Sequence, residues 1–161
     1  MRERKTTMKK ILFIGGYNSK GMKADTLENK GTKVFRLLPD YDIGLFQWIE
    51  QAEKLLGEHR INEVHASSTG AQVACKLKVD KLVLYSPVID PFNQPKVNLF
   101  SERFLEEAYA ISICSNCTVI IPEEDEVLNN VITLEFCRKN NITPIISKGD
   151  NHRLEKYFGS L

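Results

Sequence analysis

The sequence lacks the features that mark several large classes of protein. No apolar segment approaches the length of a membrane span, and the 22 basic and 21 acidic residues nearly cancel to a net charge of +1. A near-neutral balance gives no electrostatic reason to bind nucleic acid or an anionic membrane surface. The charged start lacks the apolar region of a secretory signal, so we expect residues 1–8 to form a disordered N-terminal extension of a cytoplasmic protein.

Cysteine is scarce, with four residues in 161, and two of them, Cys114 and Cys117, are separated by two positions. A structural zinc site needs four ligands, and no second cysteine pair or histidine pair follows at zinc-finger spacing. A thioredoxin-like pair follows a strand at a helix N-terminus, whereas this pair precedes the strand expected at 118–121. We therefore expect buried or half-buried thiols in a reducing compartment, with no metal and no cofactor.

Nucleotide-binding signatures are also missing. The loop at 15–21 follows the first expected strand, where a phosphate-binding loop would stand. It has neither the G-x-x-x-x-G-K-[ST] spacing nor the G-x-G-x-x-G spacing. The loop therefore gives little support to a phosphate-binding function.

The sequence does contain a regular alternation of short apolar runs and amphipathic segments, and its length and 42% hydrophobic content are enough for a proper core. Six such runs alternating with helical segments predict an α/β fold with a doubly wound parallel sheet, about six strands and helices on both faces. We expect a single domain over residues 9–161. The expected strands are 11–14, 33–38, 61–66, 81–85, 118–121 and 142–147. The expected helices are 22–29, one from 43 to about 57 capped by Asp40 or Asp42, 71–77, 101–110 capped by Ser101, 123–139 and a terminal helix ending near 158.

The sequence changes abruptly from strand to helix at residues 64–70. Ala66, Ser68 and Gly70 fit a relaxed G-x-S-x-G nucleophile elbow, in which a serine stands on a strained turn between small residues. Ser68 is therefore the candidate nucleophile. The alternative is an ordinary strand-to-helix loop in which Ser67 or Ser68 caps the helix, and this segment alone does not decide between them.

The loops after the expected strands contain a serine, an acidic run at 123–126 and His152, in the chain order Ser, Asp, His. Such loops meet at the carboxyl edge of a parallel sheet, and acyl transfer needs a hydroxyl, a base and a carboxylate that orients the base. His152 is the expected base. Of the other histidines, His59 is expected to be solvated at a helix end, and His65 to point away from the Ser68 turn.

Asp125 is the predicted orienting carboxylate, because the acidic run follows the fifth strand. Two alternatives remain: Asp90 is the acid, or the acidic run only favours a helix N-terminus.

The predicted oxyanion donors are the backbone N–H groups of Thr69 and Tyr17. Gly15 and Gly16 would let the backbone approach a substrate, although the same glycines would also suit a plain turn. Pro87, in the irregular stretch 86–100, is a further predicted substrate contact.

Four segments, in order, resemble the compact bacterial α/β-hydrolases, specifically the short YqiA/YcfP-like serine esterases. They are 13–19 against a Leu-His-Gly-Phe-Asn-Ser opening, 66–70 against a Gly-Ser-Ser-Leu-Gly elbow, 125–128 against Gly-Asp-Glu-Val-Leu, and 149–152 against a Gly-Asn-His or Gly-Asp-His ending. The resemblance implies a minimal α/β-hydrolase fold with little or no lid, and a catalytic triad of Ser68, Asp125 and His152. The sequence departs from that family at Gly15, where the family has histidine, and at Ala66 and Glu124, where it has glycine.

These features predict a serine hydrolase that cleaves a small accessible carboxylic ester or thioester through an acyl-enzyme. The expected partner is thus a small-molecule substrate, and the oligomeric state is left open. Two alternatives remain: a catalytically degenerate hydrolase that acts as a binding protein, and a peptidase or amidase with the same triad.

Overall fold

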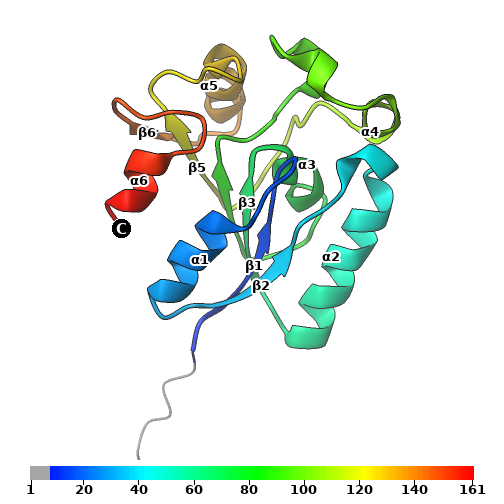
Figure 1. Ribbon diagram of the computed structural model, residues 1–161, viewed down its shortest axis with the longest axis vertical. Coiled ribbons are helices and arrows are strands. Elements are labelled where there is room, and N and C mark those ends of the chain that lie inside the picture. The colour runs from blue at the N-terminus through cyan, green and yellow to red at the C-terminus, as the bar shows by residue number, and fades with distance from the viewer. Residues whose placement is uncertain (1–7) are drawn as a thin grey trace, which may run out of the picture.

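The computed structural model describes residues 8–161 and is built around one six-stranded parallel sheet (Figure 1). The strand order is β2-β1-β3-β4-β5-β6. The strands are β1 (Lys10–Ile14), β2 (Lys33–Leu37), β3 (Glu63–Ser67), β4 (Lys81–Tyr85), β5 (Cys117–Pro122) and β6 (Ile145–Ser147). The predicted extension, residues 1–8, lies outside the described residues except for Met8, which is exposed.

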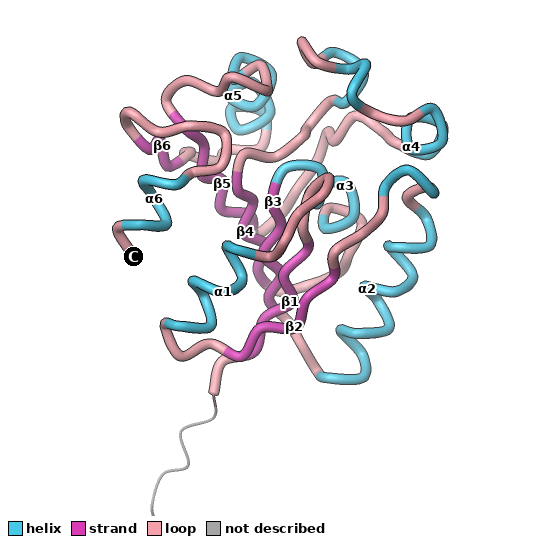
Figure 2. Tube along the Cα trace, in the orientation of Figure 1, coloured by secondary structure: helices cyan, strands magenta, loops and turns pink. Residues whose placement is uncertain are grey.

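Helices and short 3-10 turns connect the strands (Figure 2). The α-helices are α1 (Met22–Asn29), α2 (Phe46–His59), α3 (Ala71–Ala74), α4 (Glu102–Glu107), α5 (Asn130–Lys139) and α6 (Glu155–Gly159). The 3-10 turns are η1 (Tyr41–Ile43), η2 (Ser68–Gly70), η3 (Pro91–Asn93) and η4 (Val97–Leu99). Within residues 8–161, none of these helices is long and apolar enough to cross a membrane.

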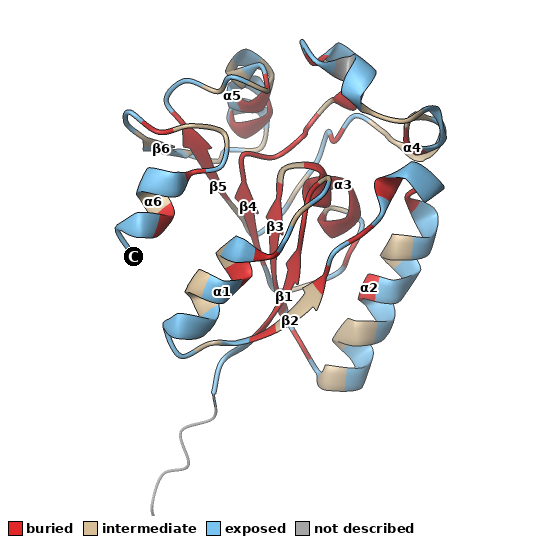
Figure 3. Cartoon of the chain, viewed as in Figure 1, coloured by how far each residue is buried: buried red, intermediate tan, exposed pale blue. Residues whose placement is uncertain are grey.

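Each face of the sheet is buried by its own set of helices, as the burial colouring in Figure 3 illustrates. Side chains alternate along β1, so that Leu12 and Ile14 join the large cluster beneath α2, α3 and α5, while Ile11 and Phe13 pack on the α1 side. Phe158 of α6 covers β4 and β5 on that second side. The predicted parallel sheet with helices on both faces is confirmed.

The chain changes direction across the sheet between β1 and β3. After β1 it adds β2 on one side, and every later strand lies on the other side of β1. At such a switch point the loops leaving the two central strands separate and leave room at the carboxyl edge of the sheet. The loop that begins with Gly15 and Gly16 and the turn that carries Ser68 leave the sheet at this point.

Two expected helix starts are wrong. α5 begins at Asn130 rather than at 123, and the Asn129 side chain caps it by accepting the Val131 N–H. The acidic run therefore lies in a loop and does not interact with a helix N-terminus. Three further elements are shorter than expected: α3 covers 71–74 in place of 71–77, α4 covers 102–107, although Ser101 caps it as predicted, and β6 covers 145–147.

α2 begins at Phe46, and neither predicted cap serves it. Asp40 instead caps η1, accepting the Asp42 N–H at 3.1 Å. The first amides of α2 donate to Glu107 Oε1, at 2.7 Å from Leu45 N and 3.3 Å from Phe46 N. A half-buried carboxylate from α4 thus takes the place of a local cap, because it accepts from amides that a helix start leaves unpaired.

Candidate active site

Ser68 lies on a strained turn between β3 and α3. Its φ of +53° is in the left-handed region, which a non-glycine residue rarely adopts. A Cβ placed on Gly70 would lie 2.5 Å from the Ile14 carbonyl oxygen, so only glycine fits there without movement. Ala66, two residues before the serine, is fully buried. The turn therefore meets the steric conditions of a nucleophile elbow.

The three residues predicted as a triad lie in one hydrogen-bonded row. Ser68 Oγ is 3.1 Å from His152 Nε2, and His152 Nδ1 is 2.9 Å from Asp125 Oδ2. The side chain of Asp125 is 1% exposed and that of His152 is 13% exposed. The buried carboxylate thus lies behind an imidazole that still reaches the surface.

The second carboxylate oxygen of Asp125 also accepts hydrogen bonds. Its Oδ1 accepts the N–H groups of Val127 and Leu128, both at 2.8 Å, so the carboxylate orientation is fixed by the backbone of its own loop. The alternative acid, Asp90, accepts hydrogen bonds from Phe92 N and Asn93 Nδ2 in its own turn. Within residues 8–161 no hydrogen bond joins Asp90 to His152.

The backbone of His152 is fixed by two residues that the sequence analysis did not single out. Glu126 accepts the His152 N–H at 3.0 Å, and Ser86 Oγ donates to the His152 carbonyl oxygen at 2.8 Å. Ser86 follows β4 and has a φ of +45°. The sequence signal that could have identified Ser86 is its position directly after the carboxyl end of β4.

Asp150 anchors the same loop two residues earlier. One of its oxygens accepts from Asn151 N and Lys156 N, and the other accepts from Ser147 Oγ and Tyr157 N. Burial alone would raise the pKa of Asp150, but these hydrogen bonds to the carboxylate lower it below its ordinary value. The segment that carries His152 is therefore closely tied to β6 and α6.

The loop after β1 passes directly against the nucleophile turn. A Cβ placed on Gly16 would lie 3.0 Å from Ser68 Cβ and 3.4 Å from the Thr69 nitrogen. A Cβ on Gly15 would lie 2.7 Å from Ser19 Cβ. Because Gly15 and Gly16 have no side chains, the loop backbone can lie close to the nucleophile turn, as an oxyanion site would need.

Tyr17 leaves that loop with its ring directed into an aromatic cluster. The ring centroid is 5.1 Å from that of Tyr41 and 5.7 Å from that of Phe104. The Ser101 N–H donates to the Tyr17 hydroxyl at 3.3 Å. The side chain therefore holds the loop against the start of α4, and the backbone amide of Tyr17 as an oxyanion donor stays a prediction.

Pro87 is buried beside the elbow. The next residue, Val88, donates its N–H to the Ser68 carbonyl oxygen at 3.0 Å. The connection after β4 is therefore fastened to the nucleophile turn, and a contact between Pro87 and substrate stays a prediction.

The other two histidines have separate surroundings. His59 lies at the end of α2 as expected, but it is half-buried and stacks on Phe35 with 4.2 Å between ring centroids, so it is only partly solvated. His65 points away from Ser68, as predicted: its Nδ1 is 2.7 Å from the Tyr85 hydroxyl. Burial lowers the pKa of His65 to about 4, which keeps the ring neutral at pH 7.

The part of the chain that the structure describes contains no group of three or more His, Cys, Asp or Glu side chains placed to hold a metal ion.

Known structures with similar folds were found at low sequence identity. A protein from Xanthomonas campestris assigned to the alpha/beta superfamily of hydrolases matches with a TM-score of 0.63 and 16% identity, over 94% of this chain and 92% of that chain. This chain has an α/β-hydrolase fold. The ydeN gene product of Bacillus subtilis matches this α/β-hydrolase fold with a TM-score of 0.66 and 14% identity, over 93% of this chain and 90% of that chain.

A third match to the α/β-hydrolase fold is the esterase domain of a Rhodothermus marinus protein. Its TM-score is 0.71 at 14% identity, over 93% of this chain and 81% of that chain. No model of a known protein family matches the sequence, and no curated protein matches it. The comparisons therefore establish the α/β-hydrolase fold, and the resemblance to the YqiA/YcfP-like group stays a prediction.

Proposed function

We propose that this protein is a serine hydrolase that cleaves a small, accessible carboxylic ester or thioester. One observation carries the proposal: Ser68 Oγ, the two ring nitrogens of His152 and Asp125 Oδ2 are linked by hydrogen bonds of 3.1 and 2.9 Å. A serine hydroxyl is a weak nucleophile until a base removes its proton, and an imidazole held by a carboxylate is suited to that task.

In the first half of the reaction Ser68 Oγ attacks the carbonyl carbon of the substrate. His152 Nε2 takes the hydroxyl proton, while Nδ1–H donates to Asp125 and keeps the ring in the tautomer that leaves Nε2 free to accept. The imidazolium then gives its proton to the departing alcohol or thiol. The product of this step is an acyl group on Ser68.

The negative charge on the tetrahedral intermediate needs backbone donors. The Thr69 N–H follows the nucleophile, and the Tyr17 N–H follows the glycine loop that packs on the nucleophile turn. Two amides at these positions are the oxyanion donors of an α/β-hydrolase elbow. In the second half of the reaction, a water activated by His152 attacks the acyl-enzyme, and the same donors stabilise the second intermediate.

An ester or thioester substrate is favoured over an amide by two considerations. Two of the neighbours are an esterase domain and a monoacylglycerol lipase, although each is only distantly similar. Alcohols and thiols are also better leaving groups than amines, so they demand less of the general acid. The partly exposed Ser68 and His152 suit a small substrate that approaches from solvent.

The test is hydrolysis of p-nitrophenyl acetate, butyrate and octanoate, a small acyl thioester and a matched p-nitroanilide. The wild type should cleave the esters or the thioester, Ser68→Ala should lose that activity, and Ser67→Ala should keep it. Ser67 is a matched control because it is a neighbouring serine whose side chain makes no capping hydrogen bond. Cleavage of the anilide alone would indicate an amidase, and no cleavage by folded protein would indicate a binding protein.

A further inference from the structure

Three of the four cysteines gather at the end of the sheet opposite Ser68. Cys117 is the first residue of β5, Cys114 lies three positions before it, and Cys75 is the C-cap residue of α3. All three are half-buried free thiols, whereas Cys137 is buried within α5. Ser68 follows the carboxyl end of β3, so this thiol cluster is separate from the candidate active site and independent of the proposed hydrolysis.

Cys114 is the centre of the thiol cluster. Its Sγ lies 3.9 Å from the Ser115 carbonyl oxygen, and the neighbouring thiols of Cys117 and Cys75 lower the pKa of Cys114, although burial opposes the shift. The same interactions, with burial, raise the pKa values of Cys117 and Cys75. These opposite directions make Cys114 the thiol of the cluster that we expect to ionise first.

The loop that carries Cys114 is held in place from α5. The Cys114 N–H donates to Asn140 Oδ1 at 3.1 Å, and Asn140 Nδ2 donates to the Ser112 carbonyl oxygen at 3.1 Å. Asn116 has a φ of +54°, which turns the chain back so that Cys114 and Cys117 stand on the two sides of one short bend. Several backbone constraints therefore fix the positions of Cys114 and Cys117.

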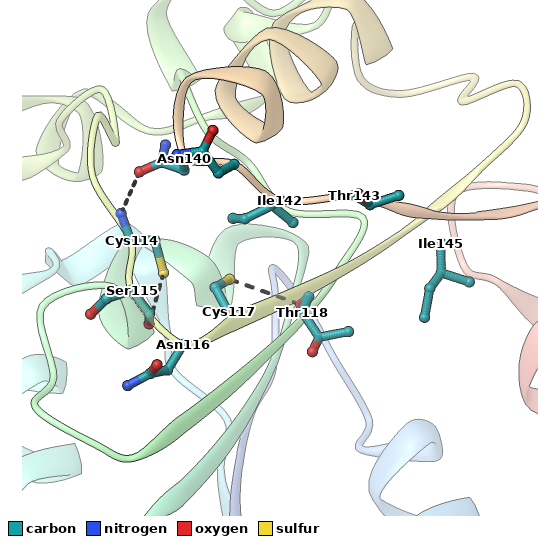
Figure 4. Close-up of a pocket in the computed structure, with 10 residues that line it drawn as sticks. Cys114, Ser115, Asn116, Cys117, Thr118, Asn140, Ile142, Thr143 and Ile145 are labelled. Atoms are coloured by element: carbon teal, nitrogen blue, oxygen red, sulfur yellow. Dashed lines mark hydrogen bonds between the residues drawn. The ribbon is translucent and has the colours of Figure 1, made fainter.

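A cavity of about 460 Å³ opens beside this bend. Figure 4 shows Cys114 and Cys117 among its lining residues, together with Thr118 and Asn140. The volume falls within the range of small-molecule sites, and the hydroxyl and amide groups of the lining suit a polar ligand. A thiolate at the edge of such a cavity is reachable by a small reagent.

We propose that Cys114 and Cys117 form a redox-active dithiol that exchanges with small-molecule disulfides. The Cys114 thiolate attacks one sulfur of the disulfide R–S–S–R, forming a mixed disulfide and releasing R–S⁻. The Cys117 thiol, after losing its proton, attacks Cys114 Sγ and releases the second R–S⁻. The protein is oxidised by two electrons to the Cys114–Cys117 disulfide, and R–S–S–R is reduced to two thiols.

Cys75 has a different part in this scheme. It lies on another element, at the end of α3, and its neighbouring thiol helps to lower the pKa of Cys114. In thioredoxin-like proteins a helix N-terminus stabilises the thiolate, and the absence of such a helix was the sequence argument against redox chemistry. Here neighbouring thiols take that place: first Cys117, three positions along the chain, and then Cys75, which is 39 positions away.

The first test measures the pH dependence of alkylation of the full-length protein by iodoacetamide, with peptide mass mapping. Cys114 should react first, with a midpoint below about 8.5, the ordinary value for a cysteine thiol. Cys75→Ala should raise that midpoint, and Cys75→Ser, which keeps a hydroxyl donor, should stay closer to the wild type. A wild-type midpoint at or above the ordinary value, or no change in Cys75→Ala, would overturn the account.

The second test equilibrates the protein with oxidised and reduced glutathione, followed by acid quenching and mapping. The wild type should form the Cys114–Cys117 disulfide, Cys117→Ser should accumulate glutathione on Cys114, and Ser115→Ala should behave as the wild type. A stable glutathione adduct on wild-type Cys114, or a disulfide between Cys75 and Cys114, would contradict the proposal. Neither test depends on whether Ser68 hydrolyses esters.

Discussion

His152 Nδ1 lies 2.9 Å from Asp125 Oδ2, although the two residues are 27 positions apart and leave the sheet from different strands. The other Asp125 oxygen is bonded to two backbone amides, so the carboxylate has little freedom to turn away. This arrangement directs Nδ1–H toward Asp125 and leaves Nε2 to face Ser68. In the proposed mechanism the carboxylate thus selects the tautomer of the base.

Asp125→Asn should lower kcat by about 10⁴-fold, because an amide in place of the carboxylate favours the wrong tautomer of His152. The fold should survive, since the asparagine oxygen can still accept from the loop amides. The measurement is kcat for p-nitrophenyl acetate, with thermal unfolding as the check on folding. Asp90→Asn is the matched control and should keep activity near that of the wild type; an equal loss in both variants would argue against Asp125.

Gly70→Ala should destabilise the protein by about 1–3 kcal/mol, because the added Cβ would lie 2.5 Å from the Ile14 carbonyl oxygen. Gly57→Ala should instead stabilise it by about 0.5–1 kcal/mol, since Gly57 lies inside α2 and a Cβ there meets nothing within 4 Å. Urea unfolding of the two variants measures both changes. If Gly70→Ala and Gly57→Ala had the same free energy of unfolding, the claim that a Cβ does not fit at Gly70 would be refuted.

The fold was predictable because its determinants are local. Each strand buried on both faces is a short apolar run, and the loops that follow these strands contain the polar residues of the candidate site. Ser68 and His152 stand at such positions, and their contact follows from the parallel topology. A parallel sheet collects the ends of distant strands at one edge.

The features that the sequence did not reveal depend on partners far along the chain. The amide of Leu45 at the start of α2 is satisfied by Glu107, 62 positions away, so no local cap marks where the helix begins. His59 is covered by Phe35 from β2. The thiol cluster joins Cys75 to a loop in another part of the sequence. Composition and spacing carry no signal for such contacts.

The buried His65 should make stability fall in mild acid. The folded protein lowers the pKa of His65 from 6.5 to about 4, so between these values the unfolded chain binds the proton more tightly. The contribution of neutral His65 to the free energy of unfolding is therefore present above pH 6.5, and it is lost progressively as the pH falls toward 4. At about 1.4 kcal/mol per pKa unit, the loss between pH 7 and pH 5 is about 2 kcal/mol.

Urea unfolding at pH 7 and pH 5 measures this effect, with His65→Gln as the comparison. The variant cannot take up the proton and should lose about 2 kcal/mol less than the wild type over that interval. The difference between the two proteins removes the contribution of the other titrating groups. If the wild type and His65→Gln lost the same free energy of unfolding between pH 7 and pH 5, the lowered pKa of His65 would be contradicted.

Ser86→Ala should weaken catalysis without abolishing it. The variant removes the 2.8 Å hydrogen bond to the His152 carbonyl oxygen, which positions the base but does not touch the substrate. We expect kcat to fall by about tenfold to a hundredfold through misplacement of His152, with KM nearly unchanged. Ser86→Thr keeps a hydroxyl and should recover part of the rate; a change confined to KM would contradict this positioning role.

The most direct test of the account is covalent labelling of the protein by a fluorophosphonate probe, followed by mapping of the modified residue. Labelling should occur on Ser68, disappear in Ser68→Ala and become much slower in His152→Ala, while Ser67→Ala labels as the wild type does. That result would establish an activated serine supported by His152. Folded wild-type protein that remains unlabelled, or that is labelled at a different serine, would contradict the proposed serine hydrolase.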